Sequence, residues 1–222
     1  MLRLITSLLI FLSTAGPMQA GAWLREKGST FTSISFTSTW FLETANATYL
    51  EFGVRDDLTL GIDANIYRSP IQGQAGTVTL FLRRPLGDRD GKHRWAYELG
   101  VGADWIGDVI IPHVRTGISW GRGFSLGEKN GWMAVDASVN WDLGQGLHLT
   151  KIDSTLGLSL SDRFSGMLQV YLGSVGGESY GTLAPSFIFA PRKTKFKLQL
   201  GAEARVGAFE NTGLKIGLWR EF

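Results

Sequence analysis

The sequence predicts an all-β protein, built as a single antiparallel up-and-down β-barrel of about twelve strands. Apolar and polar residues alternate with a period of two through most of the chain after residue 30, which is the spacing of a strand with one oily face. The 222 residues include 29 glycines, 13 phenylalanines and 8 tryptophans, a mixture typical of barrels, which use glycine at bends and aromatic residues at fixed heights. The chain has no cysteine, which excludes a disulfide framework and thiolate metal sites.

The first strand is expected over residues 30–38, where the alternation is weakest. A tight hairpin follows, because residues 49–55 and 58–67 each have one oily face and Asp56-Asp57 lies between them as a turn. A second aspartate-bearing turn, Asp162-Arg163, has the same form. The other strands are expected over residues 77–83, 95–104, 113–120, 133–142, 151–160, 164–172, 183–190, 196–206 and 212–222.

The beginning of the chain has the features of a signal peptide, which we expect over residues 1–22. Arg3 precedes an apolar run, Leu4 to Ala15, which a Gly-Pro break and small residues follow. The run is shorter than the roughly 20 residues that a helix needs to span a bilayer. Cleavage could follow Ala20, but Ala20-Gly21-Ala22 is the better small-x-small site, so we expect the barrel over residues 23–222.

The number of strands follows from the remaining length. Transmembrane strands of about 9–11 residues would use roughly 120 of about 200 residues if there were twelve. Eight strands would leave overlong loops and sixteen almost none, whereas ten remains possible because the first strand is the weakest.

The last strand indicates whether the apolar face of the sheet points to lipid or to the inside of the barrel. Leu214, Ile216, Leu218 and Phe222 share one face of a strand that runs to the last residue. This ending resembles the closing strand of bacterial outer-membrane β-barrel proteins, a family in which the terminal aromatic residue is part of the signal read by the barrel assembly machinery. Arg220 departs from the pattern, although its long stem could lie along the barrel wall with the charge among the headgroups.

The resemblance implies a protein of the Gram-negative outer membrane, surrounded by lipid, with Phe222 as its assembly signal and both termini in the periplasm. A soluble β-sandwich or lipocalin-like barrel would show the same alternation with the oily face inside. The signal peptide, the terminal phenylalanine and the inward glycines favour the membrane barrel.

The polar face then becomes the lumen, and its charged residues are the candidate site. Both signs are well represented, and inward glycines and serines leave space, so we expect a narrow, weakly selective, porin-like channel for small polar solutes. Short loops leave no obvious plug domain. The alternative is a structural envelope barrel that does not conduct because its charges pair across strands. The predicted lumen-lining residues are Glu51, Arg55, Asp63, Arg83, Glu98, Asp104, His113, Arg115, Asp136, Asp142, Lys151, Asp153, Lys197, Glu203, Arg205 and Lys215.

Twelve-stranded outer-membrane barrels include small channels for acidic sugars and also a phospholipase. The channels typically line the pore with arginine and lysine tracks, whereas here acids match bases, so anion selectivity is not expected. The phospholipase-type barrel places a His and a Ser two apart on one lipid-facing strand, but His148 has Thr150 at that position. His113 with Asp104 could make an acid/base pair or a hydrogen bond at the pore mouth. We therefore expect no enzyme, with a lipid-modifying hydrolase as the lesser alternative.

Three further classes of partner are not expected. The net charge of +2 gives no basic face for nucleic acid. No histidine or acidic residue has the spacing of a metal site, and no motif indicates a cofactor.

Overall fold

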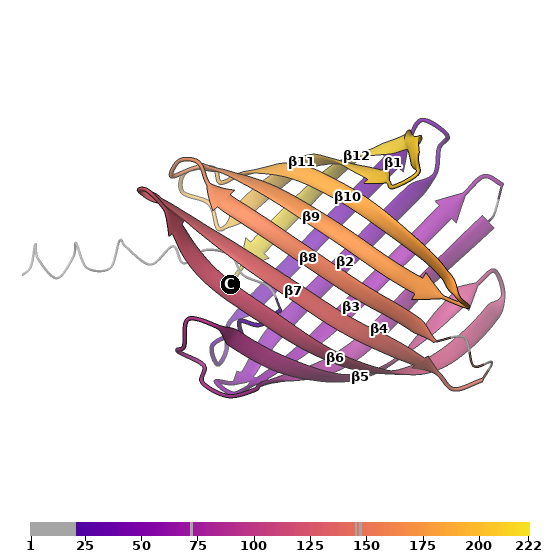
Figure 1. Ribbon diagram of the computed structural model, residues 1–222, viewed down its shortest axis with the longest axis horizontal. Helices are drawn as coiled ribbons and strands as arrows, with labels where there is room; N and C mark the ends of the chain where they lie inside the picture. Colours follow the sequence, from indigo (N-terminus) through magenta and orange to yellow (C-terminus); the bar gives the residue numbers. More distant parts are fainter. Residues whose placement is uncertain (1–20, 72, 145, 147) are drawn as a thin grey trace, which may run out of the picture.

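The computed structural model describes residues 21–71, 73–144, 146 and 148–222, and these residues form one closed antiparallel barrel (Figure 1). Residues 1–20 of the expected signal peptide lie outside the described residues. The strands are β1 (Thr30–Thr39), β2 (Thr44–Arg55), β3 (Leu58–Ser69), β4 (Gly73–Pro85), β5 (Arg94–Ile106), β6 (Val109–Leu126), β7 (Lys129–Asp142), β8 (Leu149–Ser159), β9 (Phe164–Val175), β10 (Glu178–Phe189), β11 (Phe196–Arg205) and β12 (Ala208–Glu221). The prediction of an all-β barrel with twelve strands is confirmed.

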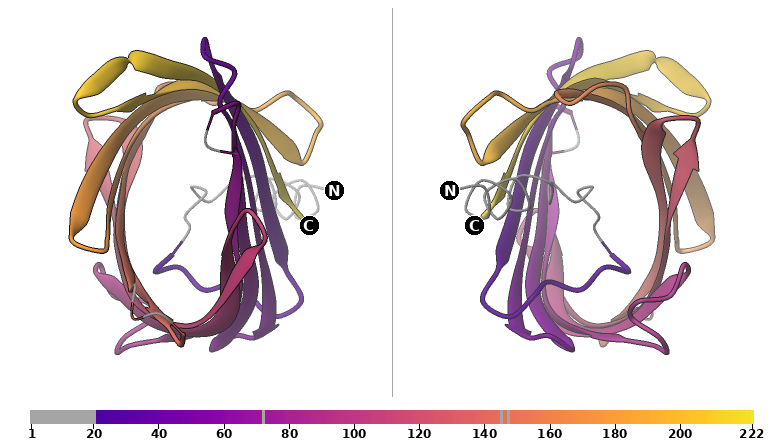
Figure 2. Two further views of the ribbon diagram at one scale, coloured as in Figure 1. Left: turned by 90° about the vertical axis from the view of Figure 1, so that its right-hand side faces the viewer. Right: turned by 90° about the vertical axis from the view of Figure 1, so that its left-hand side faces the viewer.

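Each strand pairs with the next along the chain, and β12 returns to pair with β1. Phe31 lies opposite Glu221 and Ile34 opposite Leu218 across this last seam. The backbone N–H of Phe222 donates to the carbonyl of Thr30 at 3.0 Å, which extends the backbone hydrogen bonds of this seam to the last residue. Closure leaves no free sheet edge, as the view along the barrel axis in Figure 2 shows.

We call the end of the barrel where β1 begins and β12 ends the proximal end, and the other the distal end. Because the strand number is even, Thr30 and Phe222 lie together at the proximal end. Which side of a membrane the proximal end faces stays a prediction.

Short connections set the register. Only Gly176 and Gly177 join β9 to β10, and Val175 pairs with Glu178 across the turn. Both glycines have left-handed φ angles, 60° and 86°. This is the geometry of a two-residue type I′ hairpin, whose twist matches that of the strands.

The structure decides which face of the sheet is inside. Outward leucines and isoleucines stay open to the surroundings, with 55% of Leu99, 62% of Leu200 and 58% of Ile216 exposed. The inward partners are polar and buried, including Glu51 and Arg115. A soluble barrel would have the reverse arrangement, so that alternative is wrong. Among the described residues, no helix is long and apolar enough to cross a membrane.

Residues 21–29, which we call the N-terminal strap, enter the proximal end of the barrel before β1. Ala22 and Trp23 are buried there against Ala134 of β7. In Figure 2 this indigo segment crosses the outline of the barrel. Among the short loops the sequence indicated no plug domain, and this segment was assigned no role, whereas the strap occupies part of the lumen.

Several inward glycines do not leave the free space that the sequence suggested. A Cβ atom on Gly61 would lie 2.1 Å from the ring of Phe81, and one on Gly157 would lie 2.1 Å from the ring of Trp132. Large rings therefore lie directly against neighbouring glycine backbone, and at these positions the glycines make room for aromatic rings inside the barrel.

Candidate functional site

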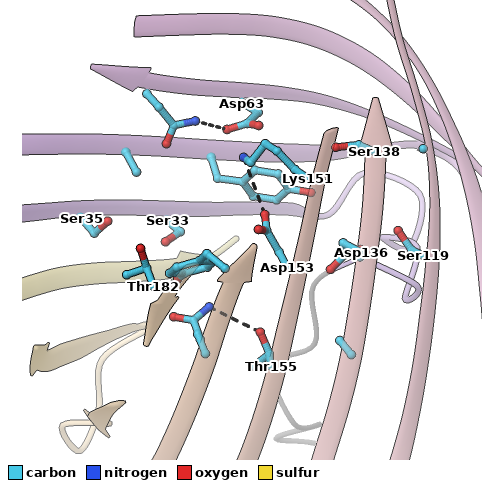
Figure 3. A pocket seen from close by; sticks show the side chains of 18 of the residues that line it. Ser33, Ser35, Asp63, Ser119, Asp136, Ser138, Lys151, Asp153, Thr155 and Thr182 are labelled. Carbon is cyan, nitrogen blue, oxygen red and sulfur yellow. Dashed lines mark hydrogen bonds and ion pairs between the residues drawn. The ribbon is translucent and has the colours of Figure 1, made fainter. Parts of the chain in front are cut away.

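A cavity of about 410 Å³ occupies the middle of the barrel and is the candidate site. Its wall extends from Trp132, near the start of β7, to Tyr67, near the distal end of β3. Serine, threonine and asparagine side chains from many strands point into it, and Figure 3 shows several of them. Nine of the predicted lumen residues line it, namely Asp63, Arg83, Glu98, Arg115, Asp136, Lys151, Asp153, Glu203 and Lys215.

One wall carries a ladder of alternating charges that begins in the strap. Arg25 Nε donates to Glu51 at 2.6 Å, and the other oxygen of Glu51 accepts a short hydrogen bond from Arg83. Arg83 also donates to Glu98 at 2.7 Å and to the hydroxyl of Tyr49 at 3.0 Å. Glu51 is fully buried and Arg83 nearly so. Carboxylates held by arginines in this way are neutralised inside the wall rather than offered to a solute.

The ladder continues toward the distal end on β6. Arg115 donates to Asp63 at 2.8 Å and to the side-chain carbonyl of Asn140 at 2.9 Å, and it lies 3.8 Å from Glu98. These contacts link β3, β5, β6 and β7 across the lumen wall. A one-residue shift in any of these strands would turn its charged or polar residue outward, so the ladder helps to fix the register.

The part of the cavity wall formed by β7 and β8 is less completely paired. Asp136 of β7 faces Asp153 of β8 in direct register, and Lys151 Nζ lies 3.7 Å from Asp153. Figure 3 shows this group around the cavity, with Ser119 near Asp136. The Oδ1 atoms of both aspartates are buried and have no hydrogen-bond partner. Two acids and one lysine therefore give this side an excess of negative charge.

A second compact pair lies on β11 and β12. Lys215 donates to Glu203 at 2.6 Å and to the hydroxyl of Tyr171 at 3.3 Å. The other oxygen of Glu203 accepts from Thr37 at 2.9 Å, which ties β1 to β11 across the closing strand.

The other seven predicted lumen residues do not line this cavity. His113 and Glu51 are buried within the wall, Asp104 pairs with His113 with 25% of its side chain exposed, and Asp142 is 8% exposed near the distal end of β7. Arg55 pairs with Asp57 beside the proximal turn, with 60% of its side chain exposed. Lys197 and Arg205 lie at opposite ends of β11. Whether the sixteen residues border a conducting lumen stays a prediction.

The group around His113 resembles a nucleophile–base arrangement but has no access. His113 Nε2 lies 2.9 Å from the hydroxyl of Thr79, and its Nδ1 lies 2.8 Å from Asp104. Thr79 is fully buried and His113 is 2% exposed. A Cβ atom on Gly102 would lie 2.7 Å from Nε2, so no substrate fits beside the imidazole. The group is suited to holding β4, β5 and β6 together, not to acyl transfer.

An apolar cluster closes part of the proximal lumen. Trp132, Met167 and Ile188 are buried together and Trp219 packs against them. With the strap on the neighbouring wall, this cluster narrows the cavity toward the proximal end. The described residues contain no group of three histidine or acidic side chains that could hold a metal ion.

Sequence reasoning missed the strap and the rings that fold over glycines. The signal for the strap was present, because Trp23 and Arg25 are a large ring and a cation in a short segment that was assigned no role. The lumen-facing phase of each strand was predictable, but the ion-pair partners come from strands distant in sequence.

The comparisons with known proteins concern the fold. Neither a protein-family model nor a curated protein sequence matches the chain. The KdgM porin shares 6% identity at a TM-score of 0.54, covering 86% of this chain and 99% of the porin. An outer membrane channel from Pseudomonas putida F1 shares 12% identity at a TM-score of 0.55, covering 92% of this chain and 99% of the channel. LpxR from Salmonella typhimurium shares 8% identity at a TM-score of 0.54, covering 88% and 99%. The chain therefore has the fold of outer-membrane β-barrel proteins.

Proposed function

We propose that this protein is an outer-membrane channel, narrow and weakly selective, that passes small polar solutes. The observation that carries the proposal is that an apolar outer surface surrounds a polar cavity of about 410 Å³ at the barrel centre. The expected signal peptide and the likeness in fold to outer-membrane channels support the location. Phe222 directly follows β12 and its backbone N–H donates to Thr30, and we propose that its side chain is read by the assembly machinery.

The charges support weak selectivity. Among the described residues that line the cavity, four are basic and five acidic. Arg83, Arg115 and Lys215 each contact a carboxylate within 3 Å. The KdgM porin has been observed in complex with disordered oligogalacturonate, an acidic sugar chain. Passage of such a chain requires unpaired cations along the lumen, so we propose neutral polar solutes for this protein, with only weak selectivity between cations and anions.

Planar-bilayer recording of the refolded protein tests the proposal. We expect small discrete conductance steps and, under a salt gradient, a reversal potential close to zero. Liposome swelling should be faster in a neutral monosaccharide than in an acidic disaccharide. If the folded, heat-modifiable barrel gives no conductance steps, the proposal of a channel is overturned and the alternative of a structural barrel is favoured.

The buried Thr79–His113 contact argues against a hydrolase, and the likeness to LpxR concerns the fold alone. We therefore propose that the protein is not an enzyme. Incubation of the detergent-folded protein with phospholipid and with lipid A, followed by mass spectrometry of the lipids, should show no product. Release of fatty acid that depends on His113 would contradict this.

Phe222 provides a separate test of assembly. Its side chain is 56% exposed while its backbone is paired to Thr30. Deletion of Phe222 should reduce the amount of folded barrel in the outer membrane of cells. Refolding of the same variant in detergent should be almost unchanged, because recognition by the assembly machinery is absent there. An equal loss in both settings would assign Phe222 to stability alone.

A further inference from the structure

The N-terminal strap is fastened to the barrel wall at several points. The Arg25 side chain pairs with Glu51, and the Arg25 backbone N–H donates to the Thr59 hydroxyl at 3.0 Å. The N–H of Gly28 donates to the carbonyl of Gly53 at 2.7 Å. A Cβ atom on Gly121 would lie 2.1 Å from the ring of Trp23, so this ring lies directly against the backbone of β6. The strap is therefore packed as part of the lumen wall.

Asp136 is an acid without a sufficient counter-charge. It lies directly opposite Asp153, and like charges in this position repel. Both Oδ1 atoms are shielded from solvent and accept no hydrogen bond. Lys151 contacts Asp153, and Arg83 is engaged by Glu51 and Glu98. Asp136 accepts a hydrogen bond from the neutral Ser119 hydroxyl, and Arg83 acts on it without a direct contact. A shielded carboxylate oxygen without a partner is costly, so a cation in contact with Oδ1 would stabilise the barrel.

The backbone of Gly21 lies directly against this carboxylate. A Cβ atom on Gly21 would lie 2.2 Å from Asp136 Oδ1 and 2.7 Å from Oδ2. The nitrogen of Gly21 is bonded to the same Cα atom, so a charged group on it would be within reach of Oδ1. In the uncut chain this nitrogen is a neutral amide.

We propose that signal peptide cleavage follows Ala20 and that the new α-ammonium group of Gly21 pairs with Asp136 inside the barrel. Hydrolysis of the Ala20–Gly21 peptide bond by the signal peptidase consumes one water and leaves a carboxylate on Ala20 and an ammonium group on Gly21. The ammonium supplies the cation that Asp136 and Asp153 lack. It also keeps Ala22 in its buried position, which cleavage after Ala22 would remove.

The Gly21–Asp136 pair also bears on the proposed channel function. Its effect on conduction rests on that proposed function, whereas the pair itself does not. It fastens the first residue of the strap across the lumen, so that the strap narrows the proximal half of the channel. It also brings the basic groups around the cavity to the same number as the acidic ones, from four against five. Export and cleavage would thus complete the electrostatics of the lumen.

The cleavage site is tested first by mass spectrometry. The protein is purified from outer membranes of a Gram-negative host, denatured and digested with trypsin, which cuts after Arg25. We expect the N-terminal peptide Gly21–Arg25. A peptide that begins at Trp23 would overturn the proposal.

Protection of the amine tests the pairing. The folded protein is exposed near neutral pH to an N-hydroxysuccinimide ester, which prefers α-amines because their ordinary pKa is about 7.7–8.0 against about 10.4 for lysine. The labelled N-terminal peptide is then quantified. Asp136→Asn should label about tenfold faster than the unmodified protein, as expected for the loss of roughly 1.4 kcal/mol of pairing. Asp162→Asn, the same change in the exposed β8–β9 turn, should label like the unmodified protein.

Equal labelling of Asp136→Asn and the unmodified protein, with both barrels heat-modifiable and therefore folded, would overturn the pair. Neither measurement depends on conduction. Protection of Gly21 without conductance steps would leave the pair standing and contradict the channel, whereas conductance with an unprotected amine would do the opposite.

Discussion

Replacement of Arg83 by methionine tests whether the charge ladder holds the barrel together. Arg83 joins Glu51 of β2 to Glu98 of β5, and it also donates to Tyr49. Its guanidinium carbon lies 4.9 Å from the centre of the Phe81 ring. Methionine keeps a similar apolar stem, so the change removes the ion pairs together with the hydrogen bond to Tyr49 and the charge over the Phe81 ring.

The expected loss in the free energy of unfolding depends on which cationic partners Glu51 and Glu98 keep in the variant. Removing one partner of a buried ion pair generally costs about 3–5 kcal/mol, because the other charge is left uncompensated. Glu51 keeps Arg25 at 2.6 Å, whereas Glu98 keeps only Arg115 at 3.8 Å. One of the two acids thus remains well paired, and we expect a loss near the lower end, about 3 kcal/mol in the free energy of unfolding.

The assay is denaturant unfolding and refolding of the detergent-folded barrel, followed by tryptophan fluorescence and by heat-modifiable gel migration. The two directions must coincide for the free energy to be defined. Arg84→Met is the matched control, because Arg84 pairs with Asp57 at the surface with 47% and 37% of the side chains exposed. Such pairs contribute about 0–1 kcal/mol. A loss for Arg83→Met no larger than that for Arg84→Met would refute the assignment of the ladder as a stabilising element.

Three further changes test other parts of the structure. Gly61→Ala should destabilise the barrel by about 1–3 kcal/mol in the same titration, because the new Cβ would lie 2.1 Å from the Phe81 ring. Gly123→Ala is the control: its new Cβ would have only one backbone oxygen nearby, at 3.9 Å, so the free energy of unfolding should change little. Trp23→Gly should raise single-channel conductance while costing about 3 kcal/mol of stability, and conductance equal to that of the unmodified protein would show that the strap does not narrow the pore. The hydrogen bond from Arg84 lowers the pKa of Asp57 below its ordinary value of 3.8. The contribution of this pair to stability is therefore present above pH 3.8 and is lost as the pH falls through the lowered pKa. Asp57→Asn should flatten the fall in stability in that pH window, and an unchanged pH profile would contradict the prediction.

The alternation of Leu80, Leu82, Leu99 and Val101 with polar residues was enough to predict strands and their two faces, because the side-chain period of a strand is two. Length then limited the number of strands. The weak first strand proved to be real, and its pairing with β12 explains why a sequence with little local signal still forms a strand there: closure of the barrel supplies the hydrogen bonds that propensity does not.

The sequence by itself determined the barrel, the phase of its strands and the presence of both signs of charge on the polar face. Only the tertiary structure decided which charges meet, because Arg115 and Asp63 are 52 residues apart and are brought together by register. It also decided how much space remains, since rings such as Phe81 fold over glycines of neighbouring strands. The strap is the clearest case: nothing local specifies its path, which is set by contacts of Gly21, Trp23 and Arg25 with strands that form only when the barrel closes.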